Sequence, residues 1–189
     1  MYLKTRFFLF IILFINVAFA QDKMPPIDKS PLDVSYCPAN YPSLKIQNKN
    51  TDPLIARVIY SRPGLNNRKI FGELLPFGEV WRIGANEATE IEFFKDVYIN
   101  KFKIKKGRYT LFVIPFENKW TIIINKELDT WGAFNYDKKK DVIRMDLPLE
   151  PLSVPTEALT IYFEKNSNYF NMIMSWENVK TTLPISIIK

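Results

Sequence analysis

The chain reads Leu159-Thr-Ile-Tyr-Phe-Glu164 in one stretch and Phe170-Asn-Met-Ile-Met-Ser-Trp176 in the next, and in both stretches large apolar side chains occupy every second position. Successive side chains of a β-strand point to opposite faces, so this period of two predicts two strands with one buried face each. The polar run Lys165-Asn-Ser-Asn168 between them favours a turn. The two stretches therefore predict an antiparallel hairpin.

Short β-branched and aromatic stretches recur along the rest of the chain. They predict strands at residues 44–48, 56–61, 80–84, 88–94, 97–104, 108–115, 120–125, 141–147, 158–164, 169–176 and 183–188. Two of them, 108–115 and 120–125, are apolar on both faces, which is typical of central strands. No helical period extends over about 12 residues, so helix is expected only as one turn near 69–75 or 126–131. The expected fold is all-β, an antiparallel two-sheet sandwich that is jelly-roll-like.

The first twenty residues have the pattern of a signal peptide. Lys4 and Arg6 precede an apolar run over 7–17, and Ala18-Phe-Ala20 matches a cleavage site. We expect cleavage before Gln21 and export to the periplasm or beyond the cell. The apolar run is shorter than the roughly 20 residues of a membrane-spanning helix, so we expect no membrane anchor after cleavage.

The remaining chain divides into two parts. Residues 21–42 contain five prolines and predict an extended arm, and residues 43–189 predict one sandwich domain. The whole-chain formal charge of +6 falls to +4 without the signal peptide, and basic and acidic residues are interleaved. We therefore expect no nucleic-acid partner.

The composition excludes much catalytic chemistry. The chain has no histidine and one cysteine, Cys37, so a Ser-His-Asp triad, a papain-like dyad and the usual zinc sites lack essential parts. The six glycines match no phosphate-binding loop. We predict no catalytic residue, no metal and no cofactor, although chemistry with carboxylates alone, as in glycoside hydrolysis, stays open.

The richest motif is Tyr60-Ser-Arg-Pro-Gly-Leu-Asn-Asn-Arg-Lys-Ile-Phe-Gly-Glu-Leu-Leu-Pro-Phe-Gly-Glu-Val-Trp-Arg-Ile-Gly-Ala-Asn-Glu-Ala-Thr89. With segments 106–111, 120–125, 131–136 and 176–177, it resembles the bacterial family DUF2911 over nearly the whole mature chain. The resemblance implies exported proteins of Gram-negative bacteria and no established activity or catalytic residue. Asn67 stands before Arg68, where the family often has glycine.

The 60–89 motif gathers polar side chains around an aromatic ring, and two interpretations compete. In one, the arginines and the amide bind a carboxylate, a sulfate or sugar hydroxyls beside the ring. In the other, which we favour slightly, Arg82 pairs with Glu87 or Glu73, Asn86 caps a turn and Trp81 fills the core. The candidate residues are Arg62, Arg68, Trp81, Arg82, Asn86 and Glu87.

The segment Trp131-Gly-Ala-Phe-Asn-Tyr136 is a second candidate. Trp131 and Tyr136 offer flat rings for stacking on a sugar, and Asn135 offers an amide for its hydroxyls. The alternative, which we favour here, is a loop that its aromatic side chains pin to the sandwich. Trp120 and Trp176 alternate with polar neighbours and are expected in the core.

Three functions follow from these patterns. The first is a non-catalytic envelope protein that binds a small molecule, a glycan or a protein partner. The second is a periplasmic hydrolase that uses Glu87 with Glu73 or Asp137, and the third is a structural or assembly protein without a ligand. A pocket lined by Arg62, Arg82, Asn86 and an aromatic ring would favour binding, facing carboxylates would favour hydrolysis, and internal pairing would favour structure.

Overall fold

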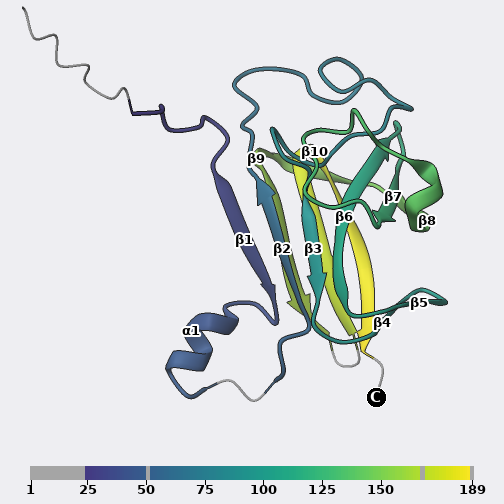
Figure 1. The fold of residues 1–189 in the computed structure, drawn as a ribbon. Helices are drawn as coiled ribbons and strands as arrows, with labels where there is room; N and C mark the ends of the chain where they lie inside the picture. Colours follow the sequence, from purple (N-terminus) through teal and green to yellow (C-terminus); the bar gives the residue numbers. More distant parts are fainter. Residues whose placement is uncertain (1–23, 50–51, 167–168, 188–189) are drawn as a thin grey trace, which may run out of the picture.

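The computed structural model describes residues 24–49, 52–166 and 169–187, so the predicted signal peptide lies outside the described residues. Two antiparallel sheets pack face to face (Figure 1). One has the order β1-β2-β3-β6-β7-β8 and the other the order β5-β4-β10-β9. The elements are β1 (Leu32–Cys37), α1 (Tyr41–Ile46), β2 (Ala56–Ser61), β3 (Glu90–Phe93), β4 (Val97–Ile99), β5 (Phe102–Ile104), β6 (Gly107–Pro115), β7 (Lys119–Asn125), η1 (Lys138–Lys140), β8 (Asp141–Pro148), β9 (Glu150–Lys165) and β10 (Tyr169–Ile187). The predicted all-β sandwich is confirmed.

The alternating stretches form the β9–β10 hairpin, as predicted. Met172 lies opposite Phe163 and Met174 opposite Ile161 in the ladder, and all four side chains are buried in the core between the sheets. Strands β6 and β7 are buried on both faces, which also agrees with the prediction. Their outer face carries a small second cluster that contains Ala88, Phe112, Ile114 and Ile123.

Three of the predicted strands are corrected. Residues 44–48 lie largely in α1, where Pro42 sits in the first turn and no residue is buried; proline is tolerated there because the first turn needs no backbone donor. Residues 80–84 form only an isolated bridge between Trp81 and Val113, because Ile83 adopts a left-handed φ of 55° that ends the extended chain. Residues 97–104 divide into β4 and β5 at Asn100, which has a φ of 53°.

Other boundaries also differ from the prediction. The two strands expected at 169–176 and 183–188 are one strand, β10, which continues past a bulge at Glu177. Strand β1 lies inside the segment predicted as an arm and forms one edge of the larger sheet. Neither 69–75 nor 126–131 is helical, and the single 3-10 turn of the described chain is η1. No helix in the described ranges is long and apolar enough to cross a membrane.

The 60–89 motif covers one end of the sandwich as a long loop (Figure 1). The Glu177 carboxylate accepts hydrogen bonds from the backbone N–H groups of Ile70 and Phe71, at 3.3 and 3.2 Å. This places Phe71 beside three tryptophans, and the ring of Trp81 stacks on that of Trp176 with centroids 5.6 Å apart. The loop therefore completes the core with aromatic side chains.

Candidate functional site

A pocket of about 300 Å³ opens between the 60–89 loop and the end of the aromatic core. It brings together three of the predicted candidates, Arg68, Trp81 and Arg82. Its other lining residues are Ser30, Pro63, Leu74, Leu75, Gly84, Ala85 and Trp176. Two arginines and no acidic residue line it, so the pocket, here called the arginine pocket, is electropositive.

Arg82 is the cation of this pocket that has no partner among the described residues. Its neighbours Trp81 and Ile83 are buried in the core, which fixes the backbone on both sides. The Nε atom is buried and has no hydrogen-bond partner, and the guanidinium forms no ion pair within the described chain. Burial lowers the pKa of Arg82, because the charged form loses water.

Neither of the ion pairs expected for Arg82 is formed. Glu73 instead pairs with Lys69, at 3.4 Å. Glu87 is exposed and lines a different hollow. An internal ion pair therefore does not account for Arg82, whereas an anion in the pocket would supply the missing opposite charge.

Arg68 is held at the rim of the pocket by its own loop. Its Nε donates to the carbonyl oxygen of Leu65 at 2.9 Å, and its Nη2 donates to that of Gly64 at 2.7 Å. The preceding Asn66 and Asn67 both have left-handed φ values, 49° and 58°. Asparagine tolerates this conformation better than most residues, so Asn67 can adopt the left-handed backbone that a glycine would adopt at this position.

The inner wall is a rigid turn beside the stacked indoles. Trp81 Nε1 donates to the carbonyl oxygen of Gly84 at 3.2 Å. Ser61 Oγ donates to the carbonyl oxygen of Ala85 and accepts from its N–H, both at 2.6 Å. Gly84 has a φ of 155°, and a Cβ there would lie 2.7 Å from Ser61 Oγ. Glycine is thus required where this turn approaches β2.

Arg62 lies outside the pocket and has a structural task. Its Nε donates to the carbonyl oxygen of Leu159 at 3.1 Å, and its Nη atoms bond Asp33 at 3.0 Å and Thr160 at 2.9 Å. These contacts join the end of β2 to β1 and to β9 in the opposite sheet. Each of the three guanidinium nitrogens takes part in one of these bonds, so the contacts of Arg62 serve to join the strands.

Asn86 also has structural contacts. Its side chain donates to Asp28 at 2.7 Å, and its carbonyl oxygen accepts from the N–H of Gly132. Of the carboxylates proposed for hydrolysis, Glu73 pairs with Lys69, and Asp137 accepts from the N–H of Lys139. Neither lines the hollow beside Glu87, so the expected carboxylate pairs are not assembled.

In the 131–136 loop, Tyr136 anchors the loop to the sandwich, whereas Trp131 and Asn135 stay accessible to a ligand. The hydroxyl of Tyr136 donates to Asp141 at 2.7 Å and accepts from Arg144 at 2.6 Å, and its ring packs on Phe112. Burial and the Asp141 carboxylate raise the pKa of Tyr136 to about 12. Trp131, in contrast, is 60% exposed, and Asn135 is exposed without a hydrogen bond to the described residues. Neither lines the arginine pocket.

Sequence reasoning missed several wall residues of the pocket. Leu74 and Leu75 belong to the motif, where Leu74 is exposed and Leu75 is half-buried, and two adjacent leucines outside any alternating stretch are the only sequence signal for them. Ser30 comes from the segment before β1, and only the folded chain brings it near Arg82. Among the described residues, no group of three or more acidic, cysteine or histidine side chains is placed to hold a metal ion.

Fold and pocket together define a class: an antiparallel β-sandwich whose longest loop closes the core and carries an electropositive pocket. The family model described as "Protein of unknown function (DUF2911)" matches residues 42–185. The chain belongs to the DUF2911 family, as its motifs suggested. The matched range contains every lining residue of the pocket except Ser30. No curated protein and no solved structure matches the chain.

Proposed function

We propose that the protein is a non-catalytic binding module that takes a small molecule with an anionic group between Arg68 and Arg82. The observation that carries this proposal is the guanidinium of Arg82, which is partly buried and forms no hydrogen bond or ion pair with any residue that the structure describes. A buried charge is costly unless it is paired. A carboxylate, sulfate or phosphate of a ligand provides the pairing and gains charge-assisted hydrogen bonds.

The walls of the pocket define the rest of the ligand. Leu74 is exposed and Leu75 is half-buried, and these two side chains offer apolar surface beside the two cations. Trp81, Trp176 and Pro63 also line the pocket but are themselves buried. A volume of about 300 Å³ lies at the lower end of the range for small-molecule sites. The ligand we propose is therefore a compact anion with an apolar body, such as an aromatic or branched-chain carboxylate. The lining contains no carboxylate or histidine that would act as a general base, which supports binding without catalysis.

We further propose that the protein meets this ligand outside the cytoplasm. The pattern of residues 1–20 supports export, with mature protein beginning at Gln21. Intact-mass analysis of the native protein tests this part. A mass that retains residues 1–20, or that includes a lipid, contradicts it.

A thermal-shift screen tests the binding proposal. Purified residues 21–189 are melted with sulfate, phosphate, benzoate, phenylacetate and short branched carboxylates. A ligand at one hundred times its Kd stabilises the folded state by about 2.7 kcal/mol, so binding raises the Tm measurably. The wild type should respond to at least one anion, and Arg82→Met should not.

Arg57→Met is the matched control. It removes the same charge, but from an arginine that is paired with Glu92 at 2.6 Å outside the pocket. This variant should respond to the anion as the wild type does. If no anion shifts the wild type, or if Arg82→Met responds equally, the pocket does not bind as proposed.

A further inference from the structure

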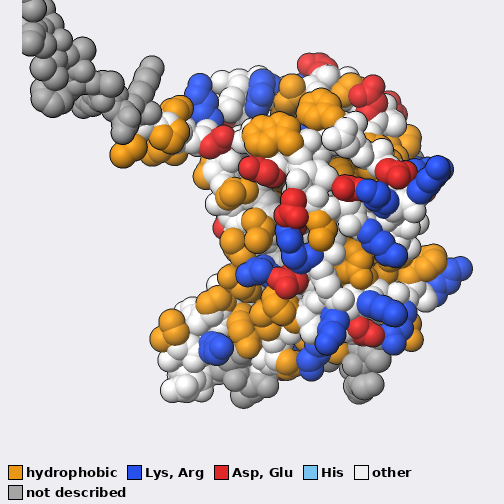
Figure 2. Space-filling model, viewed as in Figure 1, with side chains coloured by type: hydrophobic (Ala, Val, Ile, Leu, Met, Phe, Trp, Pro, Cys, Tyr) orange, Lys and Arg blue, Asp and Glu red, His pale blue; other side chains and the backbone are white. Residues whose placement is uncertain are grey.

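A groove crosses the outer face of the six-stranded sheet, away from the arginine pocket. Two hollows of about 320 and 350 Å³ share Ile59, Glu90 and Arg108 and so form one continuous depression. Its other lining residues are Leu32, Arg57, Tyr60, Ser61, Glu87, Ala88, Glu92, Asp129 and Thr130. Figure 2 shows acidic and basic side chains interspersed with apolar ones on this face.

The charges of the groove are mostly paired, with an excess of carboxylates. Arg108 bonds Glu90 and Asp129, each at 2.7 Å, and Arg57 bonds Glu92. Glu87 also lines the groove, and its carboxylate has no hydrogen bond or ion pair within the described ranges. The excess negative charge disfavours an anion here, in contrast to the arginine pocket. The two arginines in turn disfavour a polycation, so the groove suits a neutral ligand with many hydroxyl groups.

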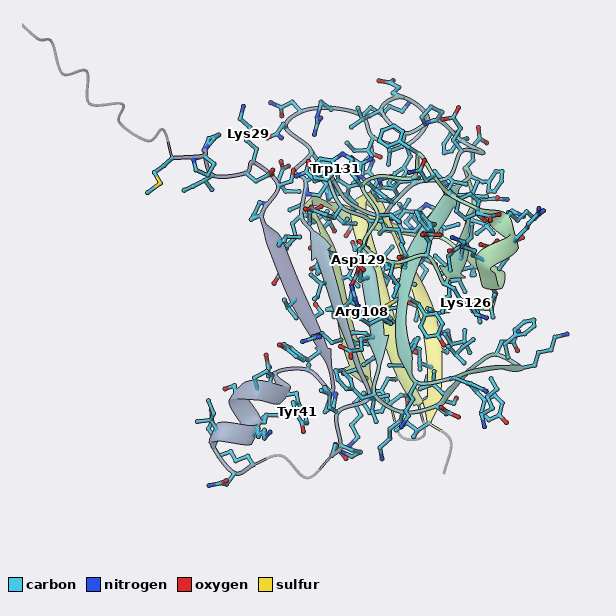
Figure 3. The ribbon with its side chains drawn as sticks, in the orientation of Figure 1. Lys29, Tyr41, Arg108, Lys126, Asp129 and Trp131 are labelled. Carbon is cyan, nitrogen blue, oxygen red and sulfur yellow. The ribbon has the colours of Figure 1, made fainter. Side chains whose placement is uncertain are left out.

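An exposed indole stands at the loop end of the groove. Trp131 forms an antiparallel bridge with Glu87, and residues paired in this way carry their side chains on the same face. Trp131 is 60% exposed, whereas Trp81, Trp120 and Trp176 are at most 4% exposed. Figure 3 shows Trp131, Asp129 and Arg108 one below the other along this face. The hydroxyl oxygen of the adjacent Thr130 is buried and has no hydrogen-bond partner within the ranges that the structure describes.

We propose that this groove is a glycan-binding site, independent of the anion site. The indole of Trp131 covers the apolar face of one sugar ring, as flat aromatic rings do in binding sites. The carboxylates of Glu87 and Asp129 accept hydrogen bonds from the hydroxyl groups, and Arg108 donates one. Leu32 and Ile59 supply the apolar floor along which an extended neutral oligosaccharide lies.

Trp131 is a built-in reporter for the test, because the other three tryptophans are buried. Residues 21–189 are titrated with neutral hexasaccharides of β-1,4-linked glucose, xylose, mannose and N-acetylglucosamine and of α-1,4-linked glucose. Calorimetry gives Kd, and acrylamide quenching reports the exposure of Trp131. At least one oligosaccharide should bind and protect the indole from quenching. Its Kd should be the same at low and at high salt concentration.

Variants then locate the site. Trp131→Ala and Glu87→Gln should each raise Kd roughly tenfold or more, and Trp131→Phe should raise it less. Phe134→Ala is the control, since this ring is 85% exposed in the same loop but, unlike Trp131, is neither paired with nor next to a residue that lines the groove. It should bind as the wild type does, and so should Arg82→Met. Circular dichroism checks that each variant is folded. If Trp131→Ala does not fold, the Kd values of Glu87→Gln and Trp131→Phe locate the site.

Three results overturn the proposal. The first is that none of the oligosaccharides binds the wild type. The second is that binding is unchanged in Trp131→Ala and Glu87→Gln. The third is that a lysine-rich peptide binds with an affinity that falls with salt while the oligosaccharides do not bind, which makes the groove a site for basic peptides.

Discussion

The hydroxyl oxygen of Tyr60 accepts a hydrogen bond of 3.0 Å from the backbone N–H of Ile161. Tyr60 lies on β2 and Ile161 on β9, so this bond joins the two sheets. Strand β9 is an edge strand, and its free backbone groups are further bonded by Ser35 and Arg62. Side chains from β1, β2 and the start of the 60–89 loop thus close the side of the sandwich where ladder bonds are missing.

Tyr60→Phe should destabilise the protein. The change leaves the buried N–H of Ile161 without a partner, which costs about 1 to 3 kcal/mol of unfolding free energy. Urea unfolding measures the difference. Tyr98→Phe is the control, because Tyr98 is 40% exposed and makes no hydrogen bond with the described residues. Equal stability of Tyr60→Phe and wild type would show that this bond does not hold the sheets together.

Arg62→Ala and Arg82→Met should have opposite effects on the unliganded protein. The first removes three donors that join β1, β2 and β9, at a cost on the order of 2 kcal/mol. The second removes a partly buried cation that pairs with none of the described residues, so the Tm in anion-free buffer should stay unchanged or rise. A strong loss of stability in Arg82→Met would show that the protein itself satisfies this guanidinium.

Gly84→Ala should be more harmful than Gly78→Ala. Both glycines have a positive φ, so each alanine carries a backbone cost of about 1 kcal/mol. At Gly84 the new Cβ would also lie 2.7 Å from Ser61 Oγ. A Cβ added at Gly78 would have no atom within 4 Å. We expect a total of about 2 to 4 kcal/mol for Gly84→Ala. Chemical unfolding of both variants checks the order, and equal losses would contradict the close approach.

The stability contribution of Tyr136 should disappear at alkaline pH. Its pKa is raised from 10.0 to about 12, so above pH 10 the folded state holds a proton that the unfolded state has released. Stability from this group is therefore complete below pH 10 and is lost as the pH rises toward 12. Wild type and Tyr136→Phe are compared by urea unfolding from pH 8 to 12, and the gap in free energy should narrow with pH. A constant gap would contradict the assignment.

The sequence predicts the strands best where the apolar pattern is regular, either alternating along a strand or continuous over it. Alternation placed the β9–β10 hairpin, and continuous apolar runs placed β6 and β7. Alternation does not help in α1, because its six residues bury no side chain and so show no helical period. The segment 80–84 is predicted as a strand from its alternating apolar residues. Trp81 and Ile83 are indeed buried in the core, but they lie in a loop.

The candidate site is harder to predict, because equal residue types have different neighbours in space. Arg62 and Arg82 lie in one motif, but the fold brings Leu159 to Arg62, whereas Arg82 has no partner in the described part of the chain. Trp81 and Trp131 differ in the same way: one stacks in the core and the other is exposed. These contacts join distant segments of the chain, and local sequence patterns do not contain them.

The most direct measurement is calorimetric titration of wild type and Arg82→Met with the anion that gives the largest thermal shift. Pairing between the anion and an otherwise unpaired guanidinium predicts one site in the wild type and an affinity lower by roughly tenfold or more, about 1.4 kcal/mol, in Arg82→Met. Arg57→Met should titrate as the wild type does. Equal affinity in Arg82→Met and wild type would contradict the central claim that Arg82 is the anion-binding residue of this fold.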